Sequence, residues 1–376
     1  MINICFLVSG VNNHAPFKVL FYLASNLPKE KYRAHLVTLR RENDPRTVSN
    51  FVNSGIPVYE FNYRNRQESL LRARRDLQKF CKNHNIDIIH SHTPLSDYFA
   101  SKISNVRTVA TVHVQIFEAY PLTFGSSKGK YILEWHLSAL RKVDKAVCCC
   151  KSAYNELQKH TDNACAAPNG VPSPAPFAAI RKESLGLPSD SLVFIFAGRF
   201  DGGKNTKKLI ELFAENRDEN YYLLMLGDGV DLLTCKEMAD KHVLFFGFVD
   251  DPAPYFAISD VYLSASLTEG GRSLSQLESL SHGLIQLVSD IPSHKEVVET
   301  DPLLGYTFTE ETFSQLFGKV KQNVSRERKE AIKGIFESRF SVTGMVKAYE
   351  EIYSSLPKKT EKRASPAKRI RDGLRL

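Results

Sequence analysis

The sequence predicts an α/β protein made of two doubly wound parallel sheets. Short apolar runs alternate with amphipathic, helix-like segments along nearly all of the 376 residues, which is the pattern of parallel strands covered by helices. Six such runs precede a segment rich in proline, alanine and glycine, Ala164–Pro176, and six follow it. Because the chain is long enough for two complete hydrophobic cores, we interpret this segment as a linker between two domains.

The expected strands form two sets of six. The first set is Ile2–Ser9, His35–Leu39, Val58–Phe61, Ile86–His90, Thr108–Val112 and Ala146–Cys150. The second set is Leu192–Ala197, Tyr222–Leu226, Val243–Phe248, Val261–Ser264, Leu284–Ser289 and Gly305–Phe308. They divide the chain into an N-terminal domain, 1–165, and a C-terminal domain, 166–343. We expect a helix at 344–357 to complete the N-terminal domain and the basic tail, 358–376, to be disordered.

Composition indicates a soluble, globular protein of a reducing compartment. Hydrophobic residues make up 43% of the chain and charged residues 24%, and no apolar run reaches the roughly 18 residues of a membrane-spanning helix. The opening segment, MINICFLVSG, has no basic region before its apolar run, so we interpret it as a strand rather than a signal peptide. The seven cysteines, three of them adjacent at Cys148–Cys150, show neither metal-site nor disulfide spacing, which favours the cytoplasm.

Charge is unevenly distributed along the chain. Residues 1–165 contain 23 basic against 13 acidic side chains, and residues 166–343 contain 18 against 25. The basic first half and basic tail predict an anionic partner, such as a membrane leaflet or a phosphorylated substrate, although a solvated basic surface explains them equally well. For the aromatic and basic segment Lys128–Lys145, we favour a core-packed helix with a basic outer face over a membrane-surface helix.

The stretch Ser264–Asp290 has the pattern of a strand, a glycine turn, a helix and a second strand. Ser273 and Gln276 have the spacing of a capping box, so we expect the helix to begin at Ser273. Free backbone N–H groups would then point out beside Gly270 and Gly271 and form a seat for a phosphate or another anion. The side chains expected on the buried face of this helix are Leu274, Leu277 and Leu280.

Charged side chains and further glycine turns surround this anion seat. Glu269 and Glu278 flank it, one before the helix and one inside it. Arg199 and Lys204 lie on either side of an earlier glycine turn, and two fixed cations beside helix N–H groups suit a diphosphate. The loop is not a Walker A motif, because the pattern GxxxxGK[ST] is absent. The next two strands also end in glycine turns, the sites of Gly227 and Val249.

In the first half, polar residues follow the ends of several strands. Doubly wound sheets bind ligands beyond the carboxyl ends of their strands, and Gly10, Asn12 and Asn13 follow the first strand. This loop is a candidate wall of a site, and an ordinary connection is an equally good interpretation. His92 and His113 end two later strands. Without metal-ligand spacing, each alone is better explained as a hydrogen-bonded structural residue.

Taken in order, these motifs resemble the retaining glycosyltransferases of family 4 (glycosyl transferases group 1). Their GT-B architecture sets two Rossmann-like α/β domains on either side of a cleft. The resemblance covers nearly the whole chain and is strongest between residues 167 and 298. It rests on Ile86–His92, Thr111–His113, Pro168–Val171, Gly198–Arg199, Lys204–Asn205, Gly227–Gly229, Gly247–Val249, Ser259–Val261, Ser264, Glu269–Gly270, Leu277–Glu278, Gly283 and Asp290–Pro292.

The resemblance implies a role for each candidate residue. Donor-binding residues would be Arg199, Lys204, Gly227, Val249, Gly270, Gly271, Arg272, Ser273 and Glu278. Within that set, Arg199 and Lys204 would bind the diphosphate and Glu278 the ribose. Glu269 and His113 would be the catalytic pair that contacts the transferred sugar from opposite domains. The loop of Gly10, Asn12 and Asn13 would lie near the phosphates or the acceptor.

The resemblance also implies an activity. It predicts the retaining, metal-independent transfer of a hexose or N-acetylhexosamine from a nucleotide sugar, UDP-linked by default, to a glycan or lipid-linked glycan, with no other cofactor. Family habit places such enzymes in bacterial capsule, O-antigen or lipopolysaccharide assembly, in the cytoplasm and peripheral to the inner face of its membrane. A nucleic-acid partner is not expected. The alternatives are a non-hydrolysing sugar-nucleotide 2-epimerase of the same architecture and a non-catalytic module that binds a nucleotide sugar.

Two features depart from the family pattern. Eight residues separate Glu269 from Glu278, where the family has seven. An extra residue inside the helix would rotate Glu278 by about 100°, so we expect the Gly270–Gly271 turn to accommodate it. The loop after Gly10 lacks the family's usual glycine pair, so its contacts with phosphate or acceptor are expected to differ.

Overall fold

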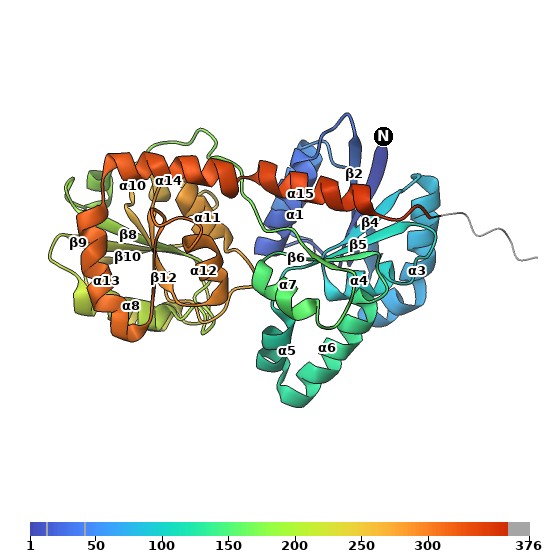
Figure 1. Ribbon diagram of the computed structural model, residues 1–376, viewed down its shortest axis with the longest axis horizontal. Helices are drawn as coiled ribbons and strands as arrows, with labels where there is room; N and C mark the ends of the chain where they lie inside the picture. Colours follow the sequence, from blue (N-terminus) through green and yellow to red (C-terminus); the bar gives the residue numbers. More distant parts are fainter. Residues whose placement is uncertain (13, 41–42, 360–376) are drawn as a thin grey trace, which may run out of the picture.

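The computed structural model describes residues 1–12, 14–40 and 43–359, which form two α/β units side by side (Figure 1). The N-terminal unit has a seven-stranded sheet of order β3-β2-β1-β4-β5-β6-β7, and the C-terminal unit a six-stranded sheet of order β10-β9-β8-β11-β12-β13. Every pairing within the two sheets is parallel. The predicted fold class, two doubly wound sheets, is confirmed.

The strands lie close to their predicted positions. Those of the first sheet are β1 (Ile2–Val8), β2 (Tyr32–Arg40), β3 (Val58–Tyr63), β4 (Ile88–Ser91), β5 (Arg107–Val112), β6 (Lys145–Cys148) and β7 (Ala164–Ala166). Those of the second sheet are β8 (Leu192–Ala197), β9 (Tyr221–Leu226), β10 (Val243–Gly247), β11 (Val261–Ser264), β12 (Ile285–Ser289) and β13 (Gly305–Phe308). The linker prediction is wrong at its start, because Ala164–Ala166 pairs with β6 as a seventh strand.

Helices connect the strands and cover both faces of each sheet. In the N-terminal unit they are α1 (Ala15–Asn26), α2 (Pro45–Asn53), α3 (Arg66–Asn83), α4 (Pro94–Ala100), α5 (Ile116–Phe124), α6 (Ser126–Leu140) and α7 (Lys151–Leu157). The others are α8 (Thr206–Asn216), α9 (Leu232–Met238), α10 (Ala253–Ile258), α11 (Leu274–Ser281), α12 (Pro292–Val298), α13 (Glu310–Asn323), α14 (Arg326–Arg339) and α15 (Val342–Ser355). None of the described helices is long and apolar enough to cross a membrane.

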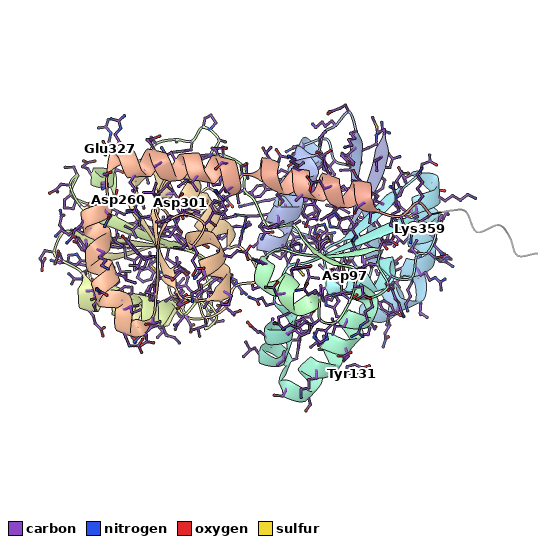
Figure 2. All side chains as sticks on the ribbon, viewed as in Figure 1. Asp97, Tyr131, Asp260, Asp301, Glu327 and Lys359 are labelled. Atoms are coloured by element: carbon purple, nitrogen blue, oxygen red, sulfur yellow. The ribbon has the colours of Figure 1, made fainter. Side chains whose placement is uncertain are left out.

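Strands that are apolar on both faces account for the two cores. In β8, LVFIFA, the Phe194 ring stacks on Phe317 of α13, with 4.8 Å between ring centroids. In α6, Leu137 and Leu140 are fully buried, so a core-packed helix is confirmed for its second half. Its first half extends away from the sheet, and Tyr131 there points outward (Figure 2).

The chain crosses between the two units twice, and the crossings are hydrogen-bonded to each other. The Val171 N–H donates to the Phe340 carbonyl (3.2 Å), and the Val342 N–H donates to the Val171 carbonyl (2.8 Å). Beyond this point α15 lies across the N-terminal unit and packs against α1 (Figure 1). The tail lies outside the described residues except for Lys358 and Lys359, and the Lys359 ammonium pairs with Asp144 at 2.6 Å.

Two buried tyrosines attach α15 to the strand ends of the first sheet. The Tyr353 hydroxyl lies 2.7 Å from Nδ1 of His90, and the Tyr349 hydroxyl lies 2.9 Å from Oγ1 of Thr111. Nε2 of His90 is 2.7 Å from the same Thr111 oxygen, which closes the network. Since all four side chains are almost completely buried, every one of these bonds replaces a bond to water.

Tyr353→Phe should destabilise the protein by about 1–3 kcal/mol, because it leaves a buried histidine nitrogen without a partner. Thermal unfolding followed by circular dichroism measures the effect. Tyr131→Phe is the matched control: its side chain is 76% exposed, so its effect should stay within about 0.5 kcal/mol. Equal melting temperatures for Tyr353→Phe and the parent would contradict a stabilising role for the network.

Candidate active site

The carboxyl ends of strands from both sheets meet where the two units touch. In each sheet the strand order reverses between two neighbours, β1 and β4 in the first and β8 and β11 in the second. Ligands of doubly wound sheets bind at such reversal points. The loop after β11 carries Glu269 and the loop after β8 carries Arg199 and Lys204. Across from them, His113 follows β5 and Cys149 follows β6.

The turn at Gly270 and Gly271 lies in close contact with the N-terminal unit. A Cβ atom at Gly270 would lie 2.2 Å from the carbonyl oxygen of His113, and one at Gly271 would lie 2.9 Å from Cβ of Cys149. Only glycine allows backbones to approach so closely. Nε2 of Gln115 adds a hydrogen bond to the Glu269 carbonyl across the same contact (3.3 Å).

Lys204 and Glu269 form a buried ion pair at this contact. The Lys204 ammonium lies 2.5 Å from Oε1 of Glu269, which also accepts a hydrogen bond from the Ser266 hydroxyl (2.9 Å). The His294 ring lies 3.9 Å from the same oxygen. Burial pushes the pKa of the Glu269 carboxyl upward, but Lys204, His294 and the two hydrogen bonds outweigh burial, so its pKa lies below the usual value. Glu269 is therefore an ionised carboxylate at neutral pH.

The loop after β8 supplies a second, freer cation. Arg199 has a side chain that is 71% exposed and pairs with Asp201 at 3.1 Å, so it can turn toward a ligand at small cost. Asp201 also accepts a hydrogen bond from the Lys204 backbone N–H (3.0 Å), which holds the glycine turn. Gly227 supports this loop from the next strand end, because a Cβ there would lie 1.8 Å from the Gly198 carbonyl oxygen.

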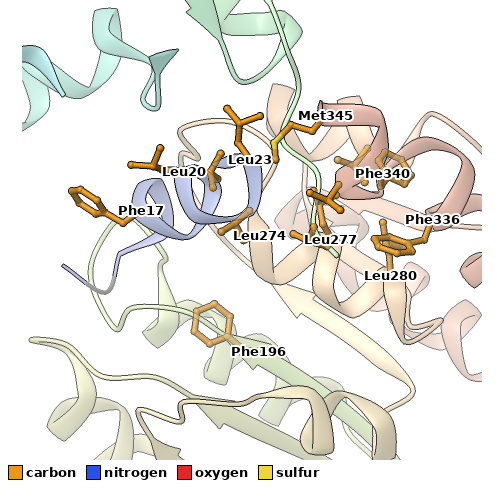
Figure 3. Packing of buried hydrophobic residues seen from close by; sticks show 14 of the residues in the cluster. Phe17, Leu20, Leu23, Phe196, Leu274, Leu277, Leu280, Phe336, Phe340 and Met345 are labelled. Carbon is orange, nitrogen blue, oxygen red and sulfur yellow. The ribbon is translucent and has the colours of Figure 1, made fainter. Parts of the chain in front are cut away.

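Glu278 lies in α11 and faces the first helix of the opposite unit. Burial raises the pKa of its carboxyl, and the Asp251 charge acts in the same direction. Lys18 and Tyr22 of α1 oppose this shift without cancelling it. Leu20 and Leu23 of α1 belong to the same buried cluster as Leu274 and Leu277 of α11, and Figure 3 shows this cluster.

The start of α11 differs from the predicted capping box. Ser273 is the N-cap residue as expected, but its side chain makes no capping bond, and its hydroxyl lies 3.2 Å from that of Ser275. Both polar side-chain atoms of Gln276 are buried without a partner among the described residues. From Leu274 the helix is regular, and residues 270–273 before it are not helical.

The remaining predicted residues have separate surroundings. The Arg272 side chain pairs with Glu296 at 3.3 Å and lies over the Phe340 ring, so only its backbone adjoins the anion seat. Val249 is half-buried beyond β10. Gly10 and the exposed Asn12 follow β1 as expected. Asn13 lies outside the described residues.

The His113 ring is held within its own unit. Its Nε2 lies 2.9 Å from Nδ1 of His92, and its Nδ1 lies 3.7 Å from Sγ of Cys149. Burial lowers the pKa of His113 to about 4, so the ring is neutral at pH 7. The backbone carbonyl of His113 therefore contacts the Gly270 turn. The His113 ring itself contacts His92 and Cys149.

Sequence reasoning missed several residues that shape the site. Glu296 accepts a hydrogen bond from the Lys151 N–H at the start of α7 (2.7 Å) and so joins the two units. Lys18 and Tyr22 occupy one face of an ordinary amphipathic helix, and no spacing signal distinguishes them. His294 follows the Asp290–Pro292 motif closely, which was the one available hint. Among the described residues, no group of three or more His, Cys, Asp or Glu side chains could hold a metal ion.

Comparison with known families identifies this arrangement. Residues 17–173 match Glycosyltransferase Family 4, and residues 178–333 match glycosyl transferases group 1. The chain belongs to the GT-B glycosyltransferases. The chain carries Arg199, Lys204, Glu269 and Glu278 in its group 1 region and His113 in its family 4 region.

Its relatives include an O-antigen biosynthesis glycosyltransferase. The O-antigen biosynthesis glycosyltransferase WclY of Escherichia coli is 25% identical over 182 residues, which are 47% of this chain and 50% of the relative. A protein from the cps region of Klebsiella pneumoniae is 26% identical over 182 residues and is covered to 48%. The glycosyltransferase thus matches about half the length of these curated relatives.

Solved structures resemble the glycosyltransferase over nearly its full length. HepE of Anabaena, solved with UDP, has a TM-score of 0.77 at 16% identity and is matched over 94% of this chain and 100% of its own. The lipopolysaccharide outer core galactosyltransferase WaaB has a TM-score of 0.69 at 16% identity, with 94% and 100% covered. Both likenesses confirm the GT-B fold.

The two site carboxyls should affect the stability of the glycosyltransferase in opposite directions. At pH 7, Glu278→Gln should raise the melting temperature, because it removes a charge that burial disfavours. Glu269→Gln should cost about 1–3 kcal/mol, because Lys204 loses its buried counter-charge. Differential scanning calorimetry between pH 7 and pH 4 measures both variants.

The pH dependence gives this pair of variants its sharpest test. The lowered pKa of Glu269 contributes stability above its usual value of 4.5 that is lost as the pH falls. The raised pKa of Glu278 contributes stability at low pH that is lost as the pH rises through its folded value. The difference in melting temperature between each variant and the parent should therefore become smaller toward pH 4. Glu30→Gln, at an exposed position, is the control, and shifts of the same sign for both site variants at pH 7 would contradict the assignment.

Proposed function

We propose that this protein is a retaining glycosyltransferase that moves a sugar from a UDP-linked donor to a glycan or lipid-linked glycan acceptor. One observation carries the proposal: the buried Lys204–Glu269 pair lies at the strand ends where the Gly270 turn touches His113 of the opposite unit. A cation and an ionised carboxylate at this point suit a phosphate leaving group and a sugar hydroxyl respectively. The Anabaena HepE structures with UDP and with UDP-glucose support the choice of nucleotide.

In the proposed reaction, the bond between the anomeric carbon and the diphosphate oxygen breaks while the acceptor hydroxyl oxygen bonds to the same face of that carbon. The acceptor proton passes to the departing phosphate oxygen, and the bonding electrons leave with the diphosphate. Negative charge therefore grows on the leaving group, where Arg199, Lys204 and the N–H groups of the Gly270–Ser273 turn stabilise it. Because the chain supplies these positive groups, we propose that no divalent metal is needed.

The two site carboxyls and the loop after β1 also have roles in the proposed reaction. Glu278 accepts hydrogen bonds from the donor ribose, with Gly227 and Val249 completing the nucleotide side. Glu269 accepts hydrogen bonds from hydroxyls of the transferred sugar, which His113 contacts from the N-terminal unit. The loop that begins with Gly10 and Asn12 is assigned to the acceptor side. Closure of the two units on the ligands would exclude water and so limit hydrolysis.

We further propose a role in bacterial surface-polysaccharide assembly. The relatives named for O-antigen biosynthesis and the structural likeness to WaaB support this pathway class. The basic N-terminal half, with 23 basic against 13 acidic residues in 1–165, favours peripheral contact with anionic lipid at the inner face of the cytoplasmic membrane.

Donor binding should depend on Lys204. At 100 times its dissociation constant UDP should add about 2.7 kcal/mol of stability, a rise in melting temperature of roughly 5–10 °C for a unit of this size. Lys204→Ala should abolish most of this rise. Lys321→Ala is the control, because it removes an equally positive side chain that pairs with Asp218 on the surface. This variant should keep the full rise in melting temperature with UDP. No shift with any nucleotide or nucleotide sugar would overturn the donor site.

Turnover should retain the anomeric configuration. Proton NMR of the product, made from UDP-sugar candidates and a lipid-linked or glycan acceptor, shows the coupling at the anomeric position. Glu269→Gln should lower kcat/KM by at least about tenfold, because it removes an ionised acceptor of sugar hydroxyls. Conversion of the nucleotide sugar without acceptor would instead indicate an epimerase. Tight binding without any turnover would indicate a non-catalytic module.

A further inference from the structure

We propose that His92 is a positioning residue that fixes the proton of His113 on Nδ1 and so makes His113 a hydrogen-bond donor to the transferred sugar. The sugar contact rests on the proposed function; the position of the proton does not. His92 follows β4 and His113 follows β5, the neighbouring strand. Their rings stack at 25° with centroids 5.2 Å apart, and Nδ1 of His92 lies 2.9 Å from Nε2 of His113.

Both rings are neutral near pH 7, so only one proton is available for the bond between them. Burial lowers the pKa of His113 to about 4, and it lowers the pKa of His92 well below its usual value. Each neutral imidazole carries one N–H and one acceptor nitrogen. Either His92 donates from Nδ1 to His113, or His113 donates from Nε2 to His92.

The far nitrogen of His92 decides between these two arrangements. Nε2 of His92 is buried and has no hydrogen-bond partner among the described residues. If His113 were the donor, the His92 proton would be on this nitrogen, as a buried N–H with no acceptor. Such orphaned donors are rare in folded proteins, because a buried N–H without an acceptor loses its bond to water and gains nothing in return. With His92 as the donor, that nitrogen carries only a lone pair, and its proton is used in the bond to His113.

The consequence for His113 follows from the same bond. Because its Nε2 accepts from His92, its own proton is on Nδ1, the nitrogen 3.7 Å from Sγ of Cys149. A thiol sulfur is a weak acceptor at long range. A sugar hydroxyl that reached this nitrogen would therefore gain a stronger bond than the one it replaces. Cys149 lies against the Gly271 turn of the opposite unit. Glu269 comes just before that turn in the chain.

Two neighbouring rings of the same unit pack against His92 and fix its orientation. Its ring lies 4.2 Å from that of His90 and 5.8 Å from that of Phe6, measured between centroids. His90 is bonded at both nitrogens, to the Tyr353 hydroxyl and to Thr111. The hydrogen-bond network that attaches α15 therefore includes His90, whose ring packs on His92, which in turn packs on His113. His113 is the ring proposed to contact the sugar.

Nitrogen NMR tests the proton position directly, on the whole protein and without any substrate. In protein labelled with 15N-histidine, long-range 1H–15N spectra distinguish the two neutral tautomers, and His113→Gln assigns the signal. His113 should show a protonated Nδ1 and an unprotonated Nε2 and should not titrate between pH 8 and pH 5. A His113 proton found on Nε2 would overturn the proposal.

Variants at His92 test the consequence for catalysis. Asn places an amide N–H near the position of Nδ1, so His92→Asn should keep the His113 tautomer and stay within about threefold of the parent kcat/KM. His92→Leu should release the tautomer and lower kcat/KM about tenfold, the value of one lost hydrogen bond, with the Kd for UDP unchanged. His35→Leu is the control, because His35 is a buried histidine whose ring nitrogens also lack partners among the described residues.

The outcomes separate this proposal from the proposed function. If no nucleotide sugar is turned over by the parent protein, the proposed function fails and the NMR result still decides the tautomer. If the parent is active and His92→Leu, folded by its melting temperature, changes neither the tautomer nor kcat/KM, His92 has no positioning role. Equal losses in His92→Leu and His92→Asn would also contradict it, since both remove the ring but only one removes the donor.

Discussion

The approach of the Gly270 backbone to the His113 carbonyl is the constraint on which the site depends. A single added methyl group at Gly270 would lie 2.2 Å from that oxygen, so any other residue would separate the two units. Glu269 precedes this glycine, and the N-terminus of α11 follows three residues after it. The distance between the two units at this point therefore sets how far the carboxylate and the helix terminus stand from His113.

Burial of charge follows from that contact and gives the two carboxyls opposite behaviour. Glu269 meets Lys204 within its own unit, and the pair compensates the loss of water. Glu278 faces Lys18 and Tyr22 from the other unit, and burial still dominates its pKa. A ligand that supplies hydrogen-bond donors to Glu278 would relieve that unfavourable burial. Proteins commonly accept a lower folding stability without ligand where function requires a charged group that is shielded from water.

The sequence predicted the fold well because its signals are local. All twelve expected strands are present, since apolar runs bounded by turns report directly on buried parallel strands. The thirteenth, β7, escaped because Ala164–Ala166 is short, made of small residues and embedded in a segment with the composition of a linker. The predicted capping box is absent, because the Ser273 side chain makes no capping bond and the buried Gln276 side chain has no partner among the described residues.

The site was predictable only where glycine turns and charges follow strands directly. Arg199, Lys204 and Glu269 have this signal, and the structure pairs Lys204 with Glu269 while Arg199 stays on the Lys204 loop, paired with Asp201. Glu278 lies inside α11. The partners that come from the opposite unit, such as Lys18 and Gln115, have no such signal. Which helix face meets another unit depends on how the two units pack, and residue spacing within one helix does not encode that.

The position of α15 has a consequence for how the protein is made. The buried tyrosines that close the first sheet, Tyr349 and Tyr353, follow the whole C-terminal unit in the chain. At about 5–20 residues per second, a ribosome needs roughly 10–40 s to move from the first sheet to this helix. During that interval His90 and Thr111 have no tyrosine partners. The buried bonds between α15 and the first sheet can therefore form only after the C-terminal unit has been synthesised.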